Sequence, residues 1–240
     1  MNETMPTTAI LDGDLVIFRA ACWAEKHKPS HEAISERLRF DIDFWTPAGV
    51  ERRLVAMSCS RKDNYRKDFW PTYKDNREGK PVPSQLGMMK EMVANREEIV
   101  FRERMEADDL IGIGMSSGKC VGVSLDKDMT SVPGWFWNPD KMAFPKLITQ
   151  DEADDFFYKQ WIMGDSTDNI PGIPKMGPKK AEKYLSMFEN HEKAEAIITL
   201  YKNKGYDLDY CLAQARCVRL VRDHEWDQDK QEHVLYNPFS

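Results

Sequence analysis

Short apolar runs recur along the first 150 residues, and most of them stop at an acidic or turn-forming position. They predict five strands, over residues 9–11, 50–59, 99–101, 121–125 and 136–138. Apolar residues at helical spacing lie between them and predict helices over 15–23, 84–97 and 106–115. Beyond residue 149 the strand signals fade, and helical periodicity continues to about residue 221.

Strands that alternate with helices, followed by a purely helical stretch, predict a fold of the α/β class. We expect a mostly parallel central sheet flanked by helices over residues 1–150 and a helical region over 151–240. No apolar run reaches the ~18 residues that a membrane span needs, so no membrane segment is expected. The acidic N-terminus is unlike a secretory signal, and the five cysteines form no CxxC pair, which together predict a cytoplasmic location.

Acidic residues gather where the predicted elements begin or end. They are Asp12, Glu106, Asp108, Asp109, Asp126, Asp128, Asp165 and Asp168. Ligands of open α/β sheets bind beyond the carboxyl ends of the strands, so these acids can converge on one place. At 4 Å two carboxylates repel by roughly 1 kcal/mol in water and ~4 kcal/mol at a dielectric of 20. A cluster therefore predicts divalent cations such as Mg²⁺ or Mn²⁺, which prefer oxygen ligands and assist phosphodiester hydrolysis in pairs.

Two alternatives bear on this prediction. Each acidic group could instead be an ordinary helix cap or turn residue. The net charge of −6 also argues at first against a nucleic-acid partner. Setting the eight acids aside, however, leaves 32 acidic against 34 basic residues, so the acidity is about the size of the proposed site.

Basic residues are concentrated in two segments. Residues 61–80 carry seven basic against four acidic residues, with four aromatic residues among them. Residues 164–185 contain a turn rich in proline and glycine, and a helix is predicted to begin near Pro178. Four lysines against one acid surround this turn. Helix N-termini and lysines bind phosphates without reading sequence, although a solvated helix–turn–helix joint would look similar.

Taken together, these motifs resemble the structure-specific 5′-nuclease family of flap endonucleases and 5′→3′ exonucleases, most closely its bacteriophage or small bacterial branch. ILDGDLVIFRA resembles the opening motif, in which Asp12 is followed seven residues later by Arg19. The arch motif of the family is similar to NYRKDFWPTYKDNR at residues 64–77. Its central acids are similar to EADD at 106–109 and SLDKD at 124–128, and its final acid pair with the helix-three-turn-helix is similar to GDSTDNIPGIPKMGPKKA at 164–181. The matches span residues 9–185, and the last 55 residues carry no recognised motif.

The resemblance implies a PIN-like core, a helical arch at about 61–95 and a helix-three-turn-helix at about 160–186. It implies that the eight acids hold two Mg²⁺ or Mn²⁺ ions, and that the hairpin 170–177 binds K⁺ through backbone carbonyls. The basic and aromatic residues implied in binding DNA fall into two sets. The catalytic set is Lys74, Arg77 and Arg19, which would hold the scissile phosphate. The DNA-binding set is Arg66, Tyr73, Lys175, Lys179 and Lys180; within it Arg66 would also contact the scissile phosphate and Tyr73 would stack on a terminal base.

One position departs from the family pattern. The family usually has an Asp seven residues before the arch arginine, and this chain has Cys59 there. Asp63 lies nearby but out of register. Either one metal loses an outer ligand, or Asp63 substitutes for it.

The resemblance implies a 5′→3′ exonuclease or flap endonuclease that acts on DNA 5′ ends, flaps or nicked duplexes, and also on RNA–DNA hybrids. Such an enzyme would serve DNA replication or repair in the cytoplasm of a bacterium or phage-infected host. One alternative is a haloacid-dehalogenase-like phosphatase, because Asp12-x-Asp14 after an apolar strand is similar to its nucleophile motif. A second alternative is a catalytically impaired DNA-binding paralogue.

Overall fold

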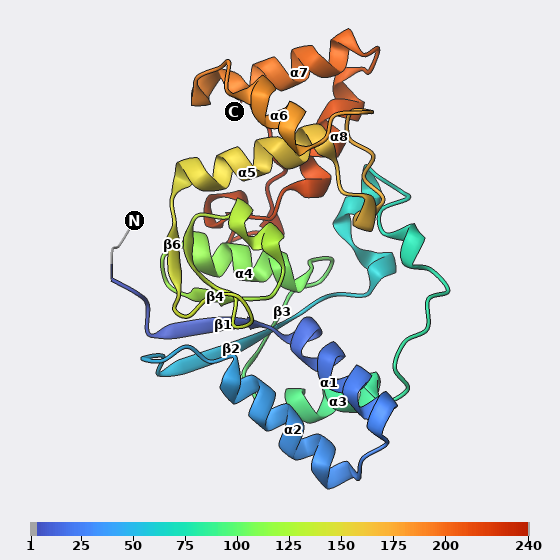
Figure 1. Ribbon diagram of the computed structural model, residues 1–240, viewed down its shortest axis with the longest axis vertical. Coiled ribbons are helices and arrows are strands. Elements are labelled where there is room, and N and C mark those ends of the chain that lie inside the picture. Colours follow the sequence, from blue (N-terminus) through green and yellow to red (C-terminus); the bar gives the residue numbers. More distant parts are fainter. Residues whose placement is uncertain (1–3, 240) are drawn as a thin grey trace.

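The computed structural model describes residues 4–239 and contains a six-stranded sheet at its centre (Figure 1). Its strands are β1 Thr8–Asp12, β2 Arg52–Met57, β3 Ile99–Phe101, β4 Val121–Val123, β5 Gly134–Trp137 and β6 Lys146–Ile148. The order across the sheet is β3-β2-β1-β4-β5-β6. All neighbours are parallel except β5 and β6, which are antiparallel. The mostly parallel sheet is therefore confirmed, and the edge strand β6 is an addition to the five predicted strands.

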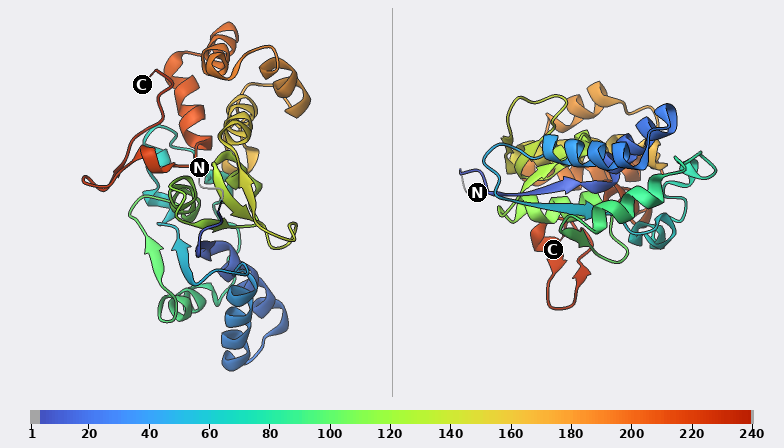
Figure 2. Two further views of the ribbon diagram at one scale, coloured as in Figure 1. Left: turned by 90° about the vertical axis from the view of Figure 1, so that its left-hand side faces the viewer. Right: turned by 90° about the horizontal axis from the view of Figure 1, so that it is seen from below.

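Helices cover both faces of this sheet. One face packs against α1 Gly13–His27, α2 His31–Phe44 and α3 Leu86–Ala94, and the other packs against α4 Ala107–Ser116 (Figure 2). Alternate residues of β1 separate the two cores, since Leu11 packs with the first group and Ile10 with the second. Gly13 begins α1 so close to β2 that an added Cβ would lie 2.6 Å from the carbonyl oxygen of Ala56.

The helical region has its own apolar core, formed by four helices and the turns between them. They are α5 Gln150–Met163, α6 Pro178–Leu185, α7 Lys193–Asn203 and α8 Leu208–Val218. The buried Trp161 donates its indole N–H to the carbonyl of Cys211 in α8, and Tyr201 of α7 donates its hydroxyl to the carbonyl of Trp161. These hydrogen bonds join three of the four helices around one aromatic side chain. No helix within residues 4–239 is both long and apolar enough to cross a membrane.

The arch segment differs from the expected helical arch. Over residues 61–77 the chain forms three short 3₁₀ turns, Arg61–Asp63, Tyr65–Asp68 and Asp75–Arg77, and then runs without regular structure to α3. Pro81 and Pro83 have no backbone N–H to donate, which explains why no helix forms across them. Only the α3 part of the segment is α-helical.

The last residues return to the sheet. After α8 the chain runs along α4, makes the 3₁₀ turn Asp223–Glu225 and forms a small antiparallel hairpin of β7 Trp226–Asp227 and β8 Glu232–His233. Leu220 and Val221 are buried in the core that contains α4. The C-terminal segment therefore ties the helical region to the sheet, a contact that no sequence pattern predicted.

Candidate functional site

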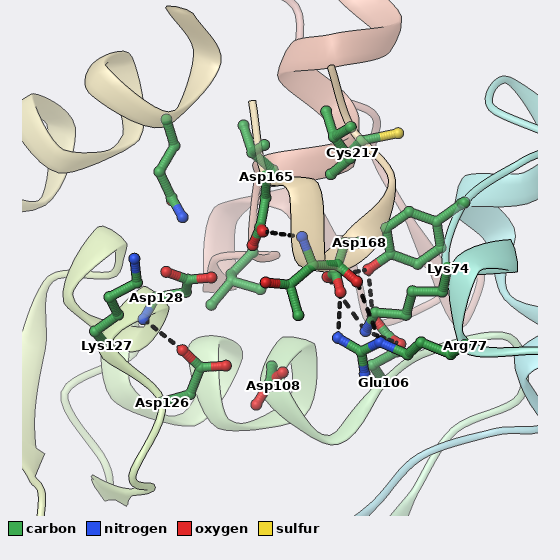
Figure 3. A pocket seen from close by; sticks show the side chains of 16 residues that line it. Lys74, Arg77, Glu106, Asp108, Asp126, Lys127, Asp128, Asp165, Asp168 and Cys217 are labelled. Atoms are coloured by element: carbon green, nitrogen blue, oxygen red, sulfur yellow. Dashed lines mark hydrogen bonds and ion pairs between the residues drawn. The ribbon is translucent and has the colours of Figure 1, made fainter. Parts of the chain in front are cut away.

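Two adjoining cavities lie at the carboxyl edge of the sheet, and most of the predicted acids line them; Figure 3 shows the first. The first, of about 330 Å³, is lined by six of these acids: Glu106, Asp108, Asp126, Asp128, Asp165 and Asp168. The second, of about 510 Å³, shares Glu106, Asp108 and Asp126 with the first and adds Asp12. The structure therefore brings together seven of the eight predicted acids. Asp109 lines neither cavity.

Parallel pairing of β1 with β4 explains why two of these acids meet. Asp12 is the last residue of β1, and Asp126 lies three residues beyond the end of β4, so both stand at the same edge. The Asp12 carboxylate accepts the backbone N–H of Leu15 at 3.0 Å and the hydroxyl of Ser124 at 2.7 Å. Asp126 accepts the backbone N–H of Asp128 at 2.9 Å. Each of these carboxylates caps a turn and still faces the cavity.

Five of the seven acids have no cationic partner within residues 4–239: Asp12, Asp108, Asp126, Asp128 and Asp165. Burial and the charges of Asp14 and Asp126 raise the pKa of Asp12 to about 6. Burial, with the charges of Asp126 and Asp165, raises the pKa of Asp128 to about 7. The pKa of Asp108 is also raised well above its usual range, by burial and by Asp12 and Asp126. These carboxylates repel one another, and the charges of Lys74 and Lys127 do not outweigh this repulsion and burial at Asp108 and Asp128.

This donor set fits a hard divalent cation, because such ions take carboxylate oxygens and relieve this repulsion. One oxygen of Asp128 is buried without any hydrogen-bond partner, as expected for a carboxylate that awaits a ligand. Within residues 4–239, no three His, Cys, Asp or Glu residues are already arranged to hold a metal ion. The carboxylates would have to turn towards the ion to bind it.

Basic residues form the opposite wall of the cavity. Lys74 lies 2.5 Å from Glu106 and 3.5 Å from Asp168, and Arg77 forms an ion pair with Asp168. Both side chains line both cavities. Burial acts to raise the pKa of Glu106, but Lys74 and Arg66 outweigh it and hold that pKa at about 2. Glu106 and Asp168 are therefore already partnered by cations, unlike the other five acids.

Two of the predicted site residues lie away from the cavities, because their side chains are fully buried against each other. Arg66, predicted to contact DNA, is 0% exposed and donates to both oxygens of Asp109, at 2.8 and 2.7 Å. Asp109, predicted to be a metal ligand, is also 0% exposed and lines neither cavity. Neither side chain can reach a ligand in the cavity.

Tyr73 and Arg19 also lie differently from the prediction. Tyr73 is 2% exposed, and its hydroxyl donates to Glu106 at 2.8 Å, so its ring cannot stack on a DNA base. Arg19 lines neither cavity and forms an ion pair with Asp140 at 3.0 Å. The seven-residue spacing from Asp12 placed Arg19 on α1, but its side chain turns towards the loop after β5.

Cys59 lines the second cavity, so the position at which the family has an Asp does face the site. Asp63, the suggested substitute, lines a different hollow beside Arg104 and neither of the two acidic cavities. Burial and the charges of Glu106 and Asp109 raise the pKa of the Cys59 thiol to about 11. Asp63 therefore lies outside the two acidic cavities, whereas Cys59 lines one of them.

The turn between α5 and α6 joins the site at one end. Asp165 and Ile170 bond through their backbones, and an added Cβ on Gly164 or Gly172 would lie within 2.5 Å of the opposite strand of this turn. A groove of about 880 Å³ runs from Asp165 to Gly177 and Pro178, where α6 begins. Three lysines are exposed at that end: Lys175, Lys179 and Lys180.

Sequence reasoning missed several residues of the site. Asp14 lines the second cavity, where it accepts Lys90 at 2.6 Å and the backbone N–H of Ser58. Three residues of the C-terminal part complete the wall of the first cavity: Cys217, Val218 and Leu220. No local signal could have found these three, because only the tertiary fold brings them to the acids.

No protein-family model matches the chain. Its sequence is 28% identical over 223 residues to an exodeoxyribonuclease of Enterobacteria phage T3, covering 82% of this chain and 72% of that protein. It is 27% identical over 203 residues to a 5′-3′ exonuclease of Buchnera aphidicola, covering 75% and 70%. Its fold resembles that of the D15 protein of bacteriophage T5, with a TM-score of 0.69, 17% identity and 89% of each chain covered. That phage T5 protein is named a flap endonuclease and has been solved with DNA and metal ions.

Proposed function

We propose that this chain, a homologue of phage and bacterial 5′-3′ exonucleases and flap endonucleases, hydrolyses DNA phosphodiesters near 5′ ends or flap junctions with the help of divalent metal ions. The observation that carries the proposal is the pair of adjoining cavities, in which five aspartates form no ion pair within residues 4–239 while Lys74 and Arg77 line both cavities. The aspartates can bind divalent cations, and Lys74 and Arg77 on the opposite wall can bind a phosphate. The two walls together therefore suit a phosphodiester bound to metal ions.

The five unpartnered aspartates would hold the ions, and we propose Mg²⁺ or Mn²⁺ at two positions. When bound, such ions activate a water molecule and stabilise the leaving oxygen of a phosphodiester. Glu106 and Asp168 would act less directly, because Lys74 and Arg77 already neutralise them. Because Cys59 stands where the family has an Asp, the site has one carboxylate ligand fewer, and one of the ions would be held by less negative charge.

Lys74 and Arg77 would bind and orient the scissile phosphate. Both line the two cavities, and each has more N–H donors than its bonds to carboxylates use, so that a phosphate can accept the others. Fixed cations aimed at a phosphate need no rearrangement as negative charge develops on it, which is a large source of catalysis. In our proposal Arg66, Arg19 and Tyr73 have no part in phosphate binding.

Duplex DNA would follow the groove from Asp165 to α6. The backbone N–H groups at the start of α6 and the exposed lysines 175, 179 and 180 suit successive phosphates. The K⁺ site at residues 170–177 belongs to this proposal, because the family resemblance implies it. The proposal also divides the chain into a core of residues 1–150 and a DNA-binding region of residues 151–240, with its helix-three-turn-helix at about 160–186. It further includes a cytoplasmic location and the use of RNA–DNA hybrids.

The phosphatase alternative finds no support. Its acid–base residue would be Asp14, which Lys90 and the backbone N–H of Ser58 already hold. The α5–α6 turn with its exposed lysines would also have no role in a small-molecule phosphatase.

Cleavage of a panel of DNA substrates tests the proposal. Purified wild type, Asp126→Asn and Asp165→Asn would be compared with Mg²⁺ on 5′-flap, nicked, blunt and RNA-primed duplexes. The matched control is Asp63→Asn, which alters an acid outside both acidic cavities. We expect the wild type and the control to cleave near the 5′ end or junction and the two site variants to be nearly inactive. Equal activity in all four proteins would reject the assigned site.

A further inference from the structure

The buried pair of Arg66 and Asp109 joins three parts of the chain that are distant in sequence. Arg66 comes from the turn Tyr65–Asp68 and donates to both oxygens of Asp109 at the start of α4. Its remaining N–H groups reach the C-terminal part, where they donate to the carbonyls of Cys217 at 3.0 Å and Arg219 at 2.7 Å. The guanidinium of Arg66 therefore joins the base of the arch segment to α4 and to the chain that follows α8.

Asp109 is saturated in this arrangement. Besides the two bonds from Arg66, its oxygens accept the backbone N–H groups of Glu106 and Val221, each at 3.2 Å. A carboxylate with four donors has no free lone pair for a metal ion. The pair also costs desolvation of two charges, and a well-packed apolar pair of similar volume is often as stable. Stability alone therefore does not account for it.

The pair acts on the catalytic wall through Glu106. Asp109 fixes the backbone of Glu106, and Arg66 also approaches the Glu106 carboxylate at 3.5 Å. That carboxylate in turn accepts Lys74 at 2.5 Å and the hydroxyl of Tyr73 at 2.8 Å. A continuous chain of hydrogen bonds thus runs from the buried arginine to the ammonium group at the cavity.

We propose that Arg66 is a positioning residue, which holds Lys74 in place through Asp109 and Glu106 and makes the C-terminal residues 217–221 part of the nuclease site. The inference rests on the proposed function, in which Lys74 orients the scissile phosphate. A displacement of about 1 Å in a group that orients the reacting atoms costs on the order of 10²-fold in rate. Arg66 thereby acts on catalysis without touching substrate.

An apolar replacement of the whole pair tests this role without leaving a buried charge. The variant combines Arg66→Met with Asp109→Leu. Its matched control combines Arg222→Met with Asp154→Leu, which removes an arginine–aspartate pair (2.7 Å) whose side chains reach neither Glu106 nor Lys74. The conservative variant is Arg66→Lys, which keeps the positive charge but loses the bidentate hydrogen bonds to Asp109.

Three quantities would be measured for each protein: the melting temperature, kcat and KM on a 5′-flap substrate, and the rate at which acetic anhydride acylates Lys74 in the metal-free protein. For the apolar pair we expect a melting temperature close to that of the wild type and kcat lower by about 10²-fold. KM should stay within about threefold, and Lys74 should acylate faster once its position is no longer fixed. Arg66→Lys should recover part of kcat, and the control pair should leave kcat and the acylation rate unchanged.

The outcomes separate the inference from the proposed function. A wild type that cleaves no DNA contradicts the proposed function. An active wild type together with wild-type kcat and acylation in the apolar-pair variant overturns the positioning role. Should the apolar pair prevent folding, Arg66→Lys decides in the same way: a lower kcat with faster acylation supports the role, and unchanged values overturn it.

Discussion

Two groups of acids that come from the same sequence motifs have opposite environments. Glu106, Asp109 and Asp168 each contact an arginine or lysine of the arch segment. The other five acids line the two cavities without an ion pair to any of the described residues 4–239. The contrast is clearest within residues 106–109, where Asp108 lines the first cavity and its neighbour Asp109 is buried against Arg66.

The difference shows how one fold divides its carboxylates between structure and chemistry. An internal cation can hold the pKa of an acid low, as at Glu106 at about 2, whereas burial still raises the pKa of Asp168 despite its contacts with Lys74 and Arg77. An acid that is buried beside other acids has a raised pKa, as Asp128 does at about 7, and needs a cation from outside. Three predictions test this division, and one tests the cationic wall that adjoins it.

The largest effect is expected for Asp108→Asn. Removing a metal-binding carboxylate should lower cleavage by about 10³-fold or more, since a metal contributes several kcal/mol to the transition state. Cleavage of a 5′-flap substrate under saturating Mg²⁺ measures this effect, with Asp63→Asn as the control. Near-normal activity would move Asp108 into the structural group.

Asp109→Asn should act on stability instead. The substitution leaves the Arg66 charge buried without its partner, which typically costs about 3–5 kcal/mol in free energy of unfolding. Urea denaturation of the metal-free protein measures this cost. In Asp108→Asn the same measurement should show no loss, because a repelled carboxylate is removed. Equal destabilisation by the two variants would contradict the division.

Lys74→Ala should slow cleavage by about 10²-fold and weaken duplex binding by less than about threefold. The reason is that Lys74 lies at the cavity, not along the duplex groove. Single-turnover rates and binding to a flap substrate in Ca²⁺ measure the two effects, with the exposed Lys62→Ala as the control. A loss confined to binding would remove Lys74 from the catalytic wall.

A smaller effect is expected in the pH dependence of stability. Asp12 and Asp128 have pKa values raised to about 6 and about 7, so the folded state binds more protons than the unfolded state between about pH 4 and 7. Their contribution to stability is therefore lost as the pH rises through this range. The low pKa of Glu106 acts oppositely and only below about pH 4.5.

Melting temperatures in chelator and in Mg²⁺ measure this effect. Because Asp12 and Asp128 are largely charged at pH 8 and largely protonated at pH 5, Mg²⁺ should raise the melting temperature more at pH 8 than at pH 5. In Asp128→Asn the difference between the two pH values should shrink. A metal effect that is the same at both pH values would indicate that these groups do not bind the ion.

Sequence patterns could predict the convergence of the acids but not their division. Strand ends in a parallel sheet share an edge, so Asp12 and Asp126 were expected to meet. Adjacent helical residues point about 100° apart, so Asp108 and Asp109 had to face different surroundings. Which of them meets the cavity depends on where Arg66 lies, and a basic segment gives no sign that one of its arginines is buried.

The remaining differences have similar causes. Arg19 follows its spacing on α1, but its direction is set by Asp140, which is distant in sequence. Residues 217–220 carry no motif and reach the cavity only through tertiary packing. Local periodicity likewise could not show that the arch segment would form short turns, since its prolines and charges suit both turns and helix ends.

Mn²⁺ affinity of matched variants distinguishes metal-binding aspartates from structural ones. Free Mn²⁺ would be measured by electron paramagnetic resonance during titration of the wild type, Asp108→Asn and Asp109→Asn at pH 8. We expect the wild type to bind Mn²⁺, Asp108→Asn to bind it at least tenfold more weakly, and folded Asp109→Asn to bind it with an affinity within about threefold of the wild type. Equal affinity in the wild type and Asp108→Asn, or no binding by the wild type, would contradict this expectation.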